Sequence, residues 1–553
     1  MFFQMRKFQV ISLLSKKLCL QLFTNNYSVN FSTMNKTVLH SFQDIPGPIS
    51  LPLIGTLYKY IPLIGEYSFT RLYESGVKKL KHYGPLIREE IVPGVQIVLV
   101  YRPEDIAEIF KAETGLYPER RSHLALLKYR KDRSDIYNTG GLLPTNGLEW
   151  WRLRKEFQKV LNKPNHVVSY LQDTDHVIKE FLPLCTEEKF DDFLPLLSRL
   201  FLELTCFTAF DVRMNSFSKE ERQKDSRSSK LIDAAFTTNS AILKLDNGPR
   251  LWRFFDTFLY KKMCKAQKYM EKYAIQFLYI INIFLFIIFK YYFIFFFLIL
   301  LFSYSIAIEM VTQKMQKKKI SQKNSFLDAY LSNPALDKKD IVGMACDMLL
   351  AGIDTTTYTM AFVFYHLGKN PKCQEKLRSE CLTLLPDSNE AIETNILHKA
   401  YYAKAVLKET FRLNPVSIGI GRILQTDIVL SGYHVPKGTV VVTQNQVTCR
   451  RPEYFDDPYS FIPERWLRKN IDTESKDFNI VKSVNPYLVL PFGHGPRSCI
   501  ARRFAEQSML TLLIRMCREL EFTWYGENLG CKSLLINKPD GPIKLNFTRY
   551  KQQ

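Results

Sequence analysis

Apolar residues recur at helical spacing over most of the chain. Residues 150–270 show this pattern, with charged positions between the apolar ones, which predicts amphipathic helices. Residues 337–368 are apolar nearly all round, as in a helix that is buried on every side. Residues 390–415 and 499–520 return to the amphipathic helical pattern. Helices should therefore make up most of the fold.

Short β-strands are predicted in two places. Residues 44–110 mix short apolar runs with Gly and Pro and include an alternating stretch at Val95–Val100. Between residues 416 and 448, β-branched runs at Ile428–Leu430 and 439–443 flank a Pro-Lys-Gly turn, which is typical of strands. No internal repeats are present. The pattern thus predicts a single domain that is mainly α with a minor β part.

One apolar stretch does not fit this picture. Residues 277–302 contain Lys290 as their single charge and are long enough to cross a bilayer. The stretch uses only Phe, Ile, Leu, Tyr, Asn and Lys, all of which have codons built from A and T alone. Membrane helices normally include Gly and other small residues, and this stretch has none.

The sequences on either side of this stretch look like two parts of one helix. Joining Ala274 to Ile308 gives a continuous amphipathic pattern, as expected for a single surface helix. We infer that residues 275–307 are a translated AT-rich intron and not part of the working protein. The alternative is a genuine membrane hairpin or anchor, which would interrupt a packed domain with a lipid-facing segment.

Composition and charge narrow the class of protein. The chain has 553 residues, of which 46% are hydrophobic and 24% charged, as in a globular protein with a substantial core. Its 11 cysteines lack the spacing of a disulfide framework or a zinc site, which favours a reducing compartment. The net charge of +21 points to an acidic partner, a membrane surface or nucleic acid.

The N-terminal segment has the composition of a targeting signal. Residues 1–43 contain no Asp or Glu but carry Lys, Arg and Ser among apolar residues. This composition predicts an organelle transit peptide, disordered or cleaved, at residues 1–43. The alternative is a disordered tail without a targeting role.

A glycine-rich loop ends in Cys499. Residues 492–498 are Phe-Gly-His-Gly-Pro-Arg-Ser, and a helix is predicted to follow. A thiolate at this junction is favoured by the helix dipole and by the nearby Arg497, Arg502 and Arg503. Such a thiolate suits a nucleophile or an axial metal ligand, and the alternative is a buried structural cysteine.

Two pairs of polar residues interrupt helical segments. Glu409 and Arg412 share one helix face, and a buried pair there needs further hydrogen bonds, for example from residues 463–466. Asp354 and Thr355 lie in the all-apolar helix, where Thr355 can bond back to a carbonyl, open the helix and, with the acid, relay protons. The alternatives are a surface ion pair and a buried Asp that the backbone satisfies.

Trp150 and Arg154 form a third pair, four residues apart on a predicted helix. An indole donor and a guanidinium on the same side suit a carboxylate partner. The alternative is an exposed basic helix face.

Taken in this order, the motifs resemble those of the cytochromes P450. The resemblance covers residues 44–274 and 308–553 and rests on four motifs, namely F-G-H-G-P-R-S-C at 492–499, A-G-I-D-T-T at 351–356, E-T-F-R at 409–412 and P-E-R-W at 463–466. It implies the cytochrome P450 fold in a single haem-thiolate domain, with haem b as the cofactor and dioxygen as a co-substrate. One departure is Ala501, where the family usually has Gly; this small change should tighten packing against the porphyrin.

The resemblance also implies roles for individual residues. Cys499 would be the axial thiolate ligand of the haem iron, and Asp354 and Thr355 would deliver protons during dioxygen activation. The other residues implied to bind the cofactor are Trp150, Arg154, Arg422, Phe492 and Arg497. The residues implied to build the core beneath the haem are Glu409, Arg412 and Arg465.

Within the family, the chain is similar to the mitochondrial class. It has a predicted transit peptide in place of an N-terminal anchor, and it has Lys404, Lys408, Arg502 and Arg503 where mitochondrial relatives dock a [2Fe-2S] ferredoxin. Four cations near the cysteine would steer an acidic electron donor, although the two lysines alone are also compatible with an ordinary solvated face. The resemblance implies a peripheral location on the matrix side of the inner mitochondrial membrane. A basic docking surface accounts for much of the net charge of +21, so no nucleic-acid partner is expected.

Three stretches, residues 118–131, 139–159 and 419–446, are similar to insect mitochondrial members of moulting-hormone synthesis. This similarity implies that the substrate is a steroid, an ecdysteroid precursor hydroxylated at side-chain carbon 22. The alternatives are another ecdysteroid position, a xenobiotic, an isomerase or dehydratase that needs no electron donor, and a non-catalytic membrane-anchored protein. Residues 120–145, 348–351 and 416–420 should face the substrate, and they are largely apolar outside the charged first loop.

The intron hypothesis predicts the structure of the transcript. Mature messenger RNA sequenced across codons 270–312 should lack the AT-rich stretch and join the two halves of the interrupted helix in frame. An abundant message that retains the stretch would contradict the hypothesis.

Overall fold

The computed structural model describes residues 39–113, 115, 117–187, 190–277, 326–467 and 484–550. The predicted transit peptide lies outside the described residues up to residue 38, and the predicted insertion lies outside them from residue 278. Residues 39–44 pack on the domain, because the His40 amide donates to the Gly432 carbonyl at 3.0 Å. The packed part of the chain therefore begins before residue 44, where the sequence analysis placed the start of the domain.

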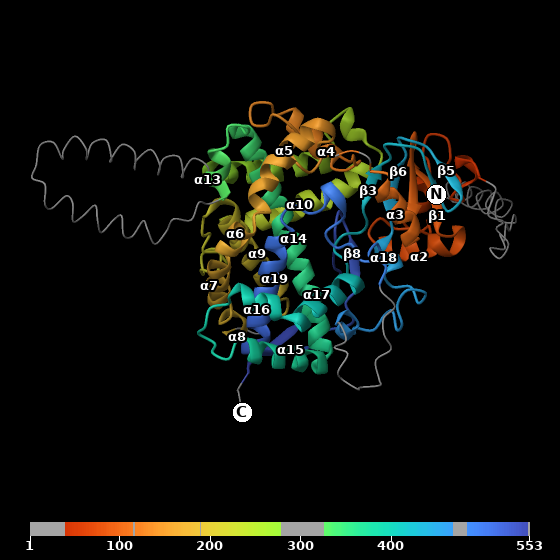
Figure 1. Cartoon of the computed structure of the whole chain (residues 1–553). Helices are drawn as coiled ribbons and strands as arrows, with labels where there is room; N and C mark the ends of the chain where they lie inside the picture. Colours follow the sequence, from red (N-terminus) through yellow and green to blue (C-terminus); the bar gives the residue numbers. More distant parts are fainter. Residues whose placement is uncertain are drawn as a thin grey trace, which may run out of the picture.

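The longest described helix, α14 (Lys338–Lys369), runs through the middle of the molecule (Figure 1). It begins at a capping box, in which the Asp337 carboxylate accepts from the Asp340 amide at 2.9 Å. The first half of α14 contributes to one large hydrophobic cluster and the second half to another. This double burial explains why the sequence of α14 is apolar on every side.

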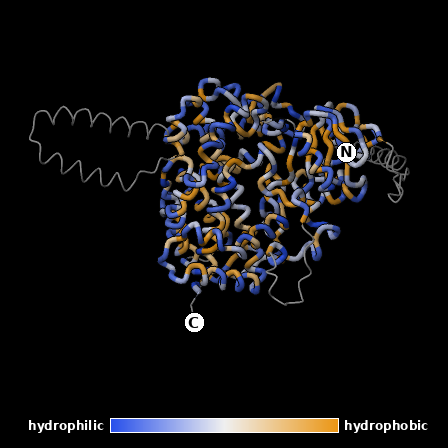
Figure 2. Tube along the Cα trace, in the orientation of Figure 1, coloured by the Kyte–Doolittle hydropathy of each residue, from blue (hydrophilic) through white to orange (hydrophobic). Residues whose placement is uncertain are grey.

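Among the described helices that pack directly against α14 are α9 (Leu194–Phe210), α10 (Arg227–Asn247), α17 (Tyr401–Leu413) and α19 (Arg502–Glu519). Figure 2 shows hydrophobic and hydrophilic positions alternating along the trace, as expected for helices that bury one side and expose the other.

Shorter helices complete the α part. They are α2 (Leu72–Tyr83), α3 (Pro103–Lys111), α4 (Leu124–Lys131), α5 (Gly147–Leu161), α6 (Pro164–Ser169), α7 (Leu171–Phe181), α8 (Leu184–Glu187), α13 (Phe326–Leu331), α15 (Pro371–Leu384), α16 (Thr394–Lys399), α18 (Asn445–Thr448) and a helix over residues 258–277. Single 3-10 turns are η1 (Phe42–Asp44), η2 (Leu57–Tyr60), η3 (Leu251–Arg253), η4 (Pro463–Trp466) and η5 (Gly495–Arg497). Within the described ranges, no helix is both long enough and apolar enough to span a bilayer.

One sheet lies to one side of the helices, whereas strands from the C-terminal part of the chain contact α14 itself (Figure 1). A four-stranded sheet has the order β1-β2-β6-β3, with β2 and β6 parallel and the other neighbours antiparallel. Its strands are β1 (Leu86–Val92), β2 (Val95–Val100), β6 (Val440–Thr443) and β3 (Gly421–Ile423). Three two-stranded pairs are β4 (Ile428–Leu430) with β5 (Tyr433–Val435), β7 (Leu520–Trp524) with β10 (Leu545–Arg549), and β8 (Cys531–Ser533) with β9 (Asn537–Pro539). The prediction of a mainly α fold with a minor β part is confirmed.

The helix over residues 258–277 extends into the segment assigned to the intron. Its Phe277 is buried, and the ring centroids of Phe277 and Phe210 lie 5.0 Å apart. The structure therefore packs Ile275 and Phe277 of the predicted insertion onto the helical core, while Gln276 between them is exposed.

A buried ion cluster joins α17 to the segment that contains η4. Glu409 pairs with Arg412 at 2.8 Å, and the side chains of both residues are fully buried. Glu409 also accepts from Arg465 Nε at 3.1 Å and from Trp466 Nε1 at 2.9 Å. Arg412 donates onward to the Pro458 carbonyl at 2.6 Å. These additional bonds offset the cost of removing the charges from water.

The ion cluster predicts a stability difference between two glutamate variants. Glu409→Gln leaves two guanidiniums without their carboxylate and should lower the free energy of unfolding by about 3 kcal/mol or more, measured by urea unfolding. The control Glu108→Gln removes an exposed pair with Lys111 and should leave the free energy of unfolding nearly unchanged. Equal losses in the two variants would show that the buried cluster adds no stability.

Candidate active site

One large cavity lies between α5, α9, α14, α19 and the cysteine loop. Its volume is about 230 Å³. Of the residues implied to bind the cofactor or relay protons, those that line it are Trp150, Arg154, Thr355, Arg497 and Cys499, and those that do not are Asp354, Arg422 and Phe492. Of the stretches expected to face the substrate, 120–145 and 348–351 contribute to the lining and 416–420 does not.

The loop before Cys499 is shaped by two glycines. Gly493 and Gly495 have φ angles of 75° and 67°, a conformation that residues with a Cβ rarely adopt. The Cys499 amide donates to the Phe492 carbonyl at 2.8 Å, which closes the loop. Phe492 itself packs behind the loop, with its ring 5.4 Å from that of Phe411. The turn presents the sulfur to the cavity and starts α19 three residues later.

The environment of Cys499 acts on its thiol in two directions. The Cys499 side chain is exposed toward the cavity. The protein packed around it still removes water from the sulfur and raises the pKa of the thiol above its ordinary value, whereas the Ala501 amide and the cations Arg154 and Arg502 lower it. The loss of water is the largest effect, so the loop and its cations alone do not favour a thiolate. A bound metal cation would supply the missing stabilisation, because metal coordination deprotonates a thiol.

Arg497 was expected to stabilise a thiolate at Cys499, but its hydrogen bonds go to other parts of the protein. Its Nε donates to the Pro118 carbonyl at 2.8 Å, and its Nη2 donates to Asn146 Oδ1 at 2.6 Å. Its guanidinium carbon lies 4.0 Å from the centre of the Trp150 ring. The side chain is therefore held on the side of the cavity next to α5.

Four guanidiniums meet at this side of the cavity. They form the arginine cluster, which consists of Arg120, Arg154, Arg422 and Arg497. Burial and the charges of the other three members lower the pKa of Arg497 to about 8. Mainly through burial, the pKa values of Arg120 and Arg154 fall to about 10. Arg422 has a carboxylate partner, Glu113.

The arginine cluster fits an acidic prosthetic group. Buried like charges are costly unless an opposite charge compensates them, and Arg497 Nη1 is buried without a hydrogen-bond partner in the described protein. Two carboxylates in the cavity would compensate the positive charges and would give Arg497 Nη1 a hydrogen-bond acceptor. The propionates of a haem are such carboxylates. Arg120 was not among the residues predicted from the sequence, because an isolated Arg in a loop gives no signal of its own.

Thr355 and Asp354 face different surroundings. Thr355 Oγ1 lines the cavity side and donates to the Ala351 carbonyl at 2.7 Å, as predicted, but α14 continues through this point without opening. The buried Asp354 carboxylate faces α10, where it accepts from Asn239 Nδ2 at 3.0 Å. Burial raises the pKa of Asp354 to about 6. The acid therefore lies beside the cavity wall and not in it.

The four predicted docking cations lie on α17 and at the start of α19. Lys408, Arg502 and Arg503 are exposed and Lys404 is half-buried. Burial lowers the pKa of Lys404, Glu380 opposes this effect and the neighbouring Lys408 adds to it. Arg502 pairs with Glu506 at 3.0 Å.

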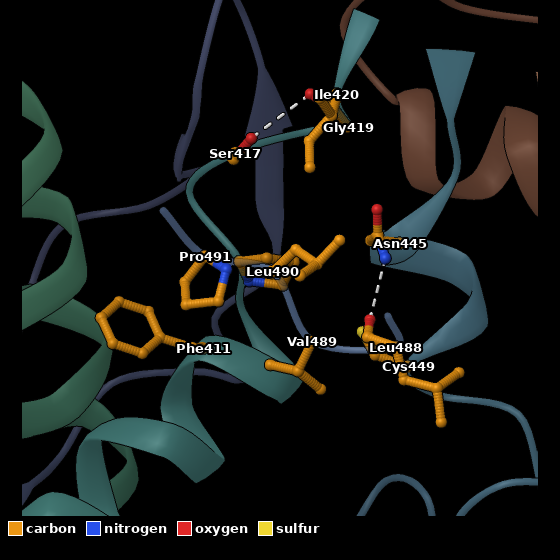
Figure 3. Close-up of a pocket in the computed structure, with 11 residues that line it drawn as sticks. Phe411, Ser417, Gly419, Ile420, Asn445, Cys449, Leu488, Val489, Leu490 and Pro491 are labelled. Carbon is orange, nitrogen blue, oxygen red and sulfur yellow. Dashed lines mark hydrogen bonds between the residues drawn. The ribbon is translucent and has the colours of Figure 1, made fainter. Parts of the chain in front are cut away.

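Figure 3 shows a second cavity, behind the segment that leads to the cysteine loop. Its volume is about 10 Å³, enough for one water molecule at most. Phe411, Val489 and Leu490 line it, and Asn445 Nδ2 donates to the Leu488 carbonyl at 3.0 Å beside it. This cavity is a packing feature of the loop support.

Comparison with known proteins identifies relatives over nearly the whole chain. A family model described as "Cytochrome P450" matches residues 45–281 and 301–545, and the unmatched residues 282–300 fall inside the predicted insertion. Cytochrome P450 302a1, mitochondrial, of Drosophila melanogaster is 44% identical over 530 residues, which cover 95% of this chain and 99% of that protein. Probable cytochrome P450 12a5, mitochondrial, of the same species is 31% identical over 508 residues, covering 88% of this chain and 87% of that protein. Probable cytochrome P450 49a1 is 29% identical over 516 residues, with 92% and 82% coverage.

The raised pKa of Asp354 predicts how stability depends on pH. An unfolded Asp titrates near 3.8 and the folded Asp354 near about 6, so between these values the folded state binds more protons than the unfolded state. The free energy of unfolding should therefore fall as pH rises from about 4 to 6, by about 3 kcal/mol from this group. Asp354→Asn should remove that part of the fall in urea unfolding series, and the exposed control Asp225→Asn should not. An unchanged slope in Asp354→Asn would contradict the assignment.

Proposed function

The chain belongs to the cytochrome P450 family, and we propose that it hydroxylates side-chain carbon 22 of an ecdysteroid precursor in the mitochondrion. The predictions of the family and of monooxygenase activity are confirmed. Family membership implies haem and dioxygen, and we propose haem b. The observation that carries the proposal is the meeting of one thiol, three guanidiniums and a threonine hydroxyl around one cavity, with the Arg422 guanidinium next to them.

When bound, the haem supplies an iron centre that activates dioxygen with electrons from a donor protein. Cys499 Sγ would be the protein ligand of the iron, and the arginine cluster would hold the propionates. The Thr355 hydroxyl lies on the cavity side and can pass a proton inward. Asp354, whose pKa is about 6, exchanges protons near neutral pH and can resupply Thr355 when its carboxyl turns from Asn239 toward the cavity.

The lining of the cavity supports a steroid substrate. Leu142, Leu143, Leu204, Met344 and Met348 give it an apolar wall, which suits a hydrocarbon framework. The stretches that resemble ecdysteroid hydroxylases include the loop that provides two of these leucines. The choice of carbon 22 rests on that resemblance.

The proposed electron donor is an acidic [2Fe-2S] ferredoxin. The cations of α17 and α19 lie on the two helices that flank the cysteine loop, and the Glu506 carboxylate acts on both Lys404 and Cys499. A basic surface next to the metal ligand attracts an acidic partner and shortens the path of the electron. Two of the relatives carry "mitochondrial" in their names, which supports a mitochondrial donor.

We propose that the protein rests on the matrix side of the inner mitochondrial membrane. Large apolar side chains are exposed on two loops: Leu53 and Leu63 are 92% and 106% exposed, and Phe254 and Phe258 are 86% and 84% exposed. Exposed apolar groups of this size favour a lipid or protein surface over water. A peripheral contact of this kind would bring an apolar substrate close to the cavity.

The docking proposal predicts a charge-specific loss of donor binding. Lys404→Glu with Lys408→Glu should weaken ferredoxin binding about tenfold or more at low salt and flatten its salt dependence, with an unchanged haem spectrum. The control Lys219→Glu with Lys224→Glu makes the same charge change in the exposed α9–α10 loop and should bind ferredoxin normally. Equal affinities of the two double variants would refute the docking site.

The substrate proposal is tested by mapping the product. The chain without residues 1–43 and 275–307, reconstituted with a matrix ferredoxin and its reductase, should hydroxylate an ecdysteroid precursor that lacks hydroxyls at carbons 20 and 22. NMR should place the new oxygen on carbon 22. Oxygen at another carbon would contradict the assignment to carbon 22 but not the steroid substrate. A folded haem protein that leaves the steroid unreacted would contradict the steroid substrate itself.

A further inference from the structure

One member of the arginine cluster has a carboxylate of the protein as its partner. Arg422 on β3 pairs with Glu113, which follows the end of α3. The two side chains are 5% and 10% exposed, so the pair is held inside the protein. Within the described part of the chain, Glu113 is the one carboxylate that forms an ion pair with a member of the cluster. The proposed haem site uses Arg422 but gives no role to Glu113.

The pair lies against the loop that carries Cys499. Arg422 Nη2 donates to the His494 carbonyl at 3.0 Å. Gly495 has a φ of 67°, and a Cβ at this position would lie 3.0 Å from Glu113 Oε2. Glycine at this turn therefore allows the backbone both to adopt its conformation and to approach the carboxylate closely. Both charges act on the loop within five residues of the sulfur.

Aromatic side chains pack around the pair. The Phe110 ring lies 5.4 Å from the guanidinium carbon of Arg422 and 4.6 Å from the His494 ring. The Tyr487 ring lies 6.0 Å from that of Phe110. Packing of this kind keeps water away from the charges, so they are screened weakly and act over longer distances than exposed charges do.

The pair affects the charge balance around the cavity. The two propionates of a haem would compensate only two of the four guanidiniums of the arginine cluster. The charge of Arg422 contributes to lowering the pKa values of Arg120 and Arg497, so its influence reaches the cavity wall. Glu113 compensates the charge of Arg422 within the protein. Without this carboxylate, a further uncompensated cation would lie beside a bound haem.

We propose that Glu113 is a positioning residue of the haem site, which holds Arg422 against the cysteine loop and offsets its charge, so that the bound iron is reduced less readily. A nearby negative charge stabilises the more positive ferric iron, whereas a nearby cation favours the ferrous iron. The inference rests on the proposed haem site and deepens it, because it names a residue that sets how readily the protein accepts an electron from its donor.

The test is the reduction potential of the ferric and ferrous couple, measured by optical redox titration of the holoenzyme without substrate. Glu113→Gln preserves the size of the side chain and removes its charge. It should favour the ferrous state about tenfold, a shift of about 59 mV to more positive potential for one electron. Glu108→Gln makes the same substitution at an exposed position of α3 and should leave the potential unchanged. An unshifted potential in Glu113→Gln would overturn the proposal.

Two further variants separate the charge of Glu113 from its packing. Glu113→Gln combined with Arg422→Gln removes both charges, so its potential should return toward the wild-type value although the contact with the loop is lost. A purely structural role predicts instead that the double variant is displaced at least as far as Glu113→Gln. Glu113→Asp shortens the side chain but keeps its charge, and its potential should stay near that of the wild type. If the double variant does not retain haem, equal potentials of Glu113→Asp and Glu113→Gln would still refute the proposal.

The outcomes distinguish this inference from the proposed substrate. The potentials are measured without a steroid, so a protein that shows the charge-dependent shift but leaves an ecdysteroid precursor unreacted would retain the role of Glu113 and lose the steroid substrate. Hydroxylation of the steroid with a potential that is indifferent to Glu113 would do the reverse. A wild-type protein that binds no haem would overturn both.

Discussion

Uncompensated positive charge is the constraint around which the active-site region is arranged. Members of the arginine cluster lie close enough for burial and mutual repulsion to lower the pKa of Arg497 to about 8. Such an arrangement is costly in an empty cavity and favourable around a ligand with carboxylates. The thiol of Cys499 shows the same dependence, because the loss of water disfavours its thiolate and a metal cation would favour it. Both ends of the cavity are therefore suited to one prosthetic group that carries a metal and two acids.

The rest of the fold holds these groups in place. The two glycines before Cys499 turn the chain so that the sulfur faces the cavity. Behind the loop, α17 is fixed by the buried Glu409–Arg412 pair and its bonds to the segment around Arg465. On the opposite wall, α14 is apolar on every side because two hydrophobic clusters enclose it. Rigid supports of this kind keep reacting groups in position, which is a large part of catalysis.

Much of this structure was predictable from local sequence patterns. The apolar stretch 337–368 corresponds to α14, the alternating stretch Val95–Val100 is β2, and the fold class is confirmed. Cys499 and the Glu409 pair stood out because their motifs are short and contiguous. The directions of Arg497 and Asp354 and the place of Arg120 depend on contacts between distant segments. Sequence spacing within one helix carries no information about such contacts.

The central claim is that Cys499 binds the iron of a haem in this cavity. The carbon-monoxide difference spectrum of the reduced protein tests it most directly. We predict the red-shifted band that is diagnostic of a thiolate ligand, and we predict that Cys499→Ala loses this band. A wild-type spectrum without the band, or a Cys499→Ala spectrum that retains it, would contradict the account.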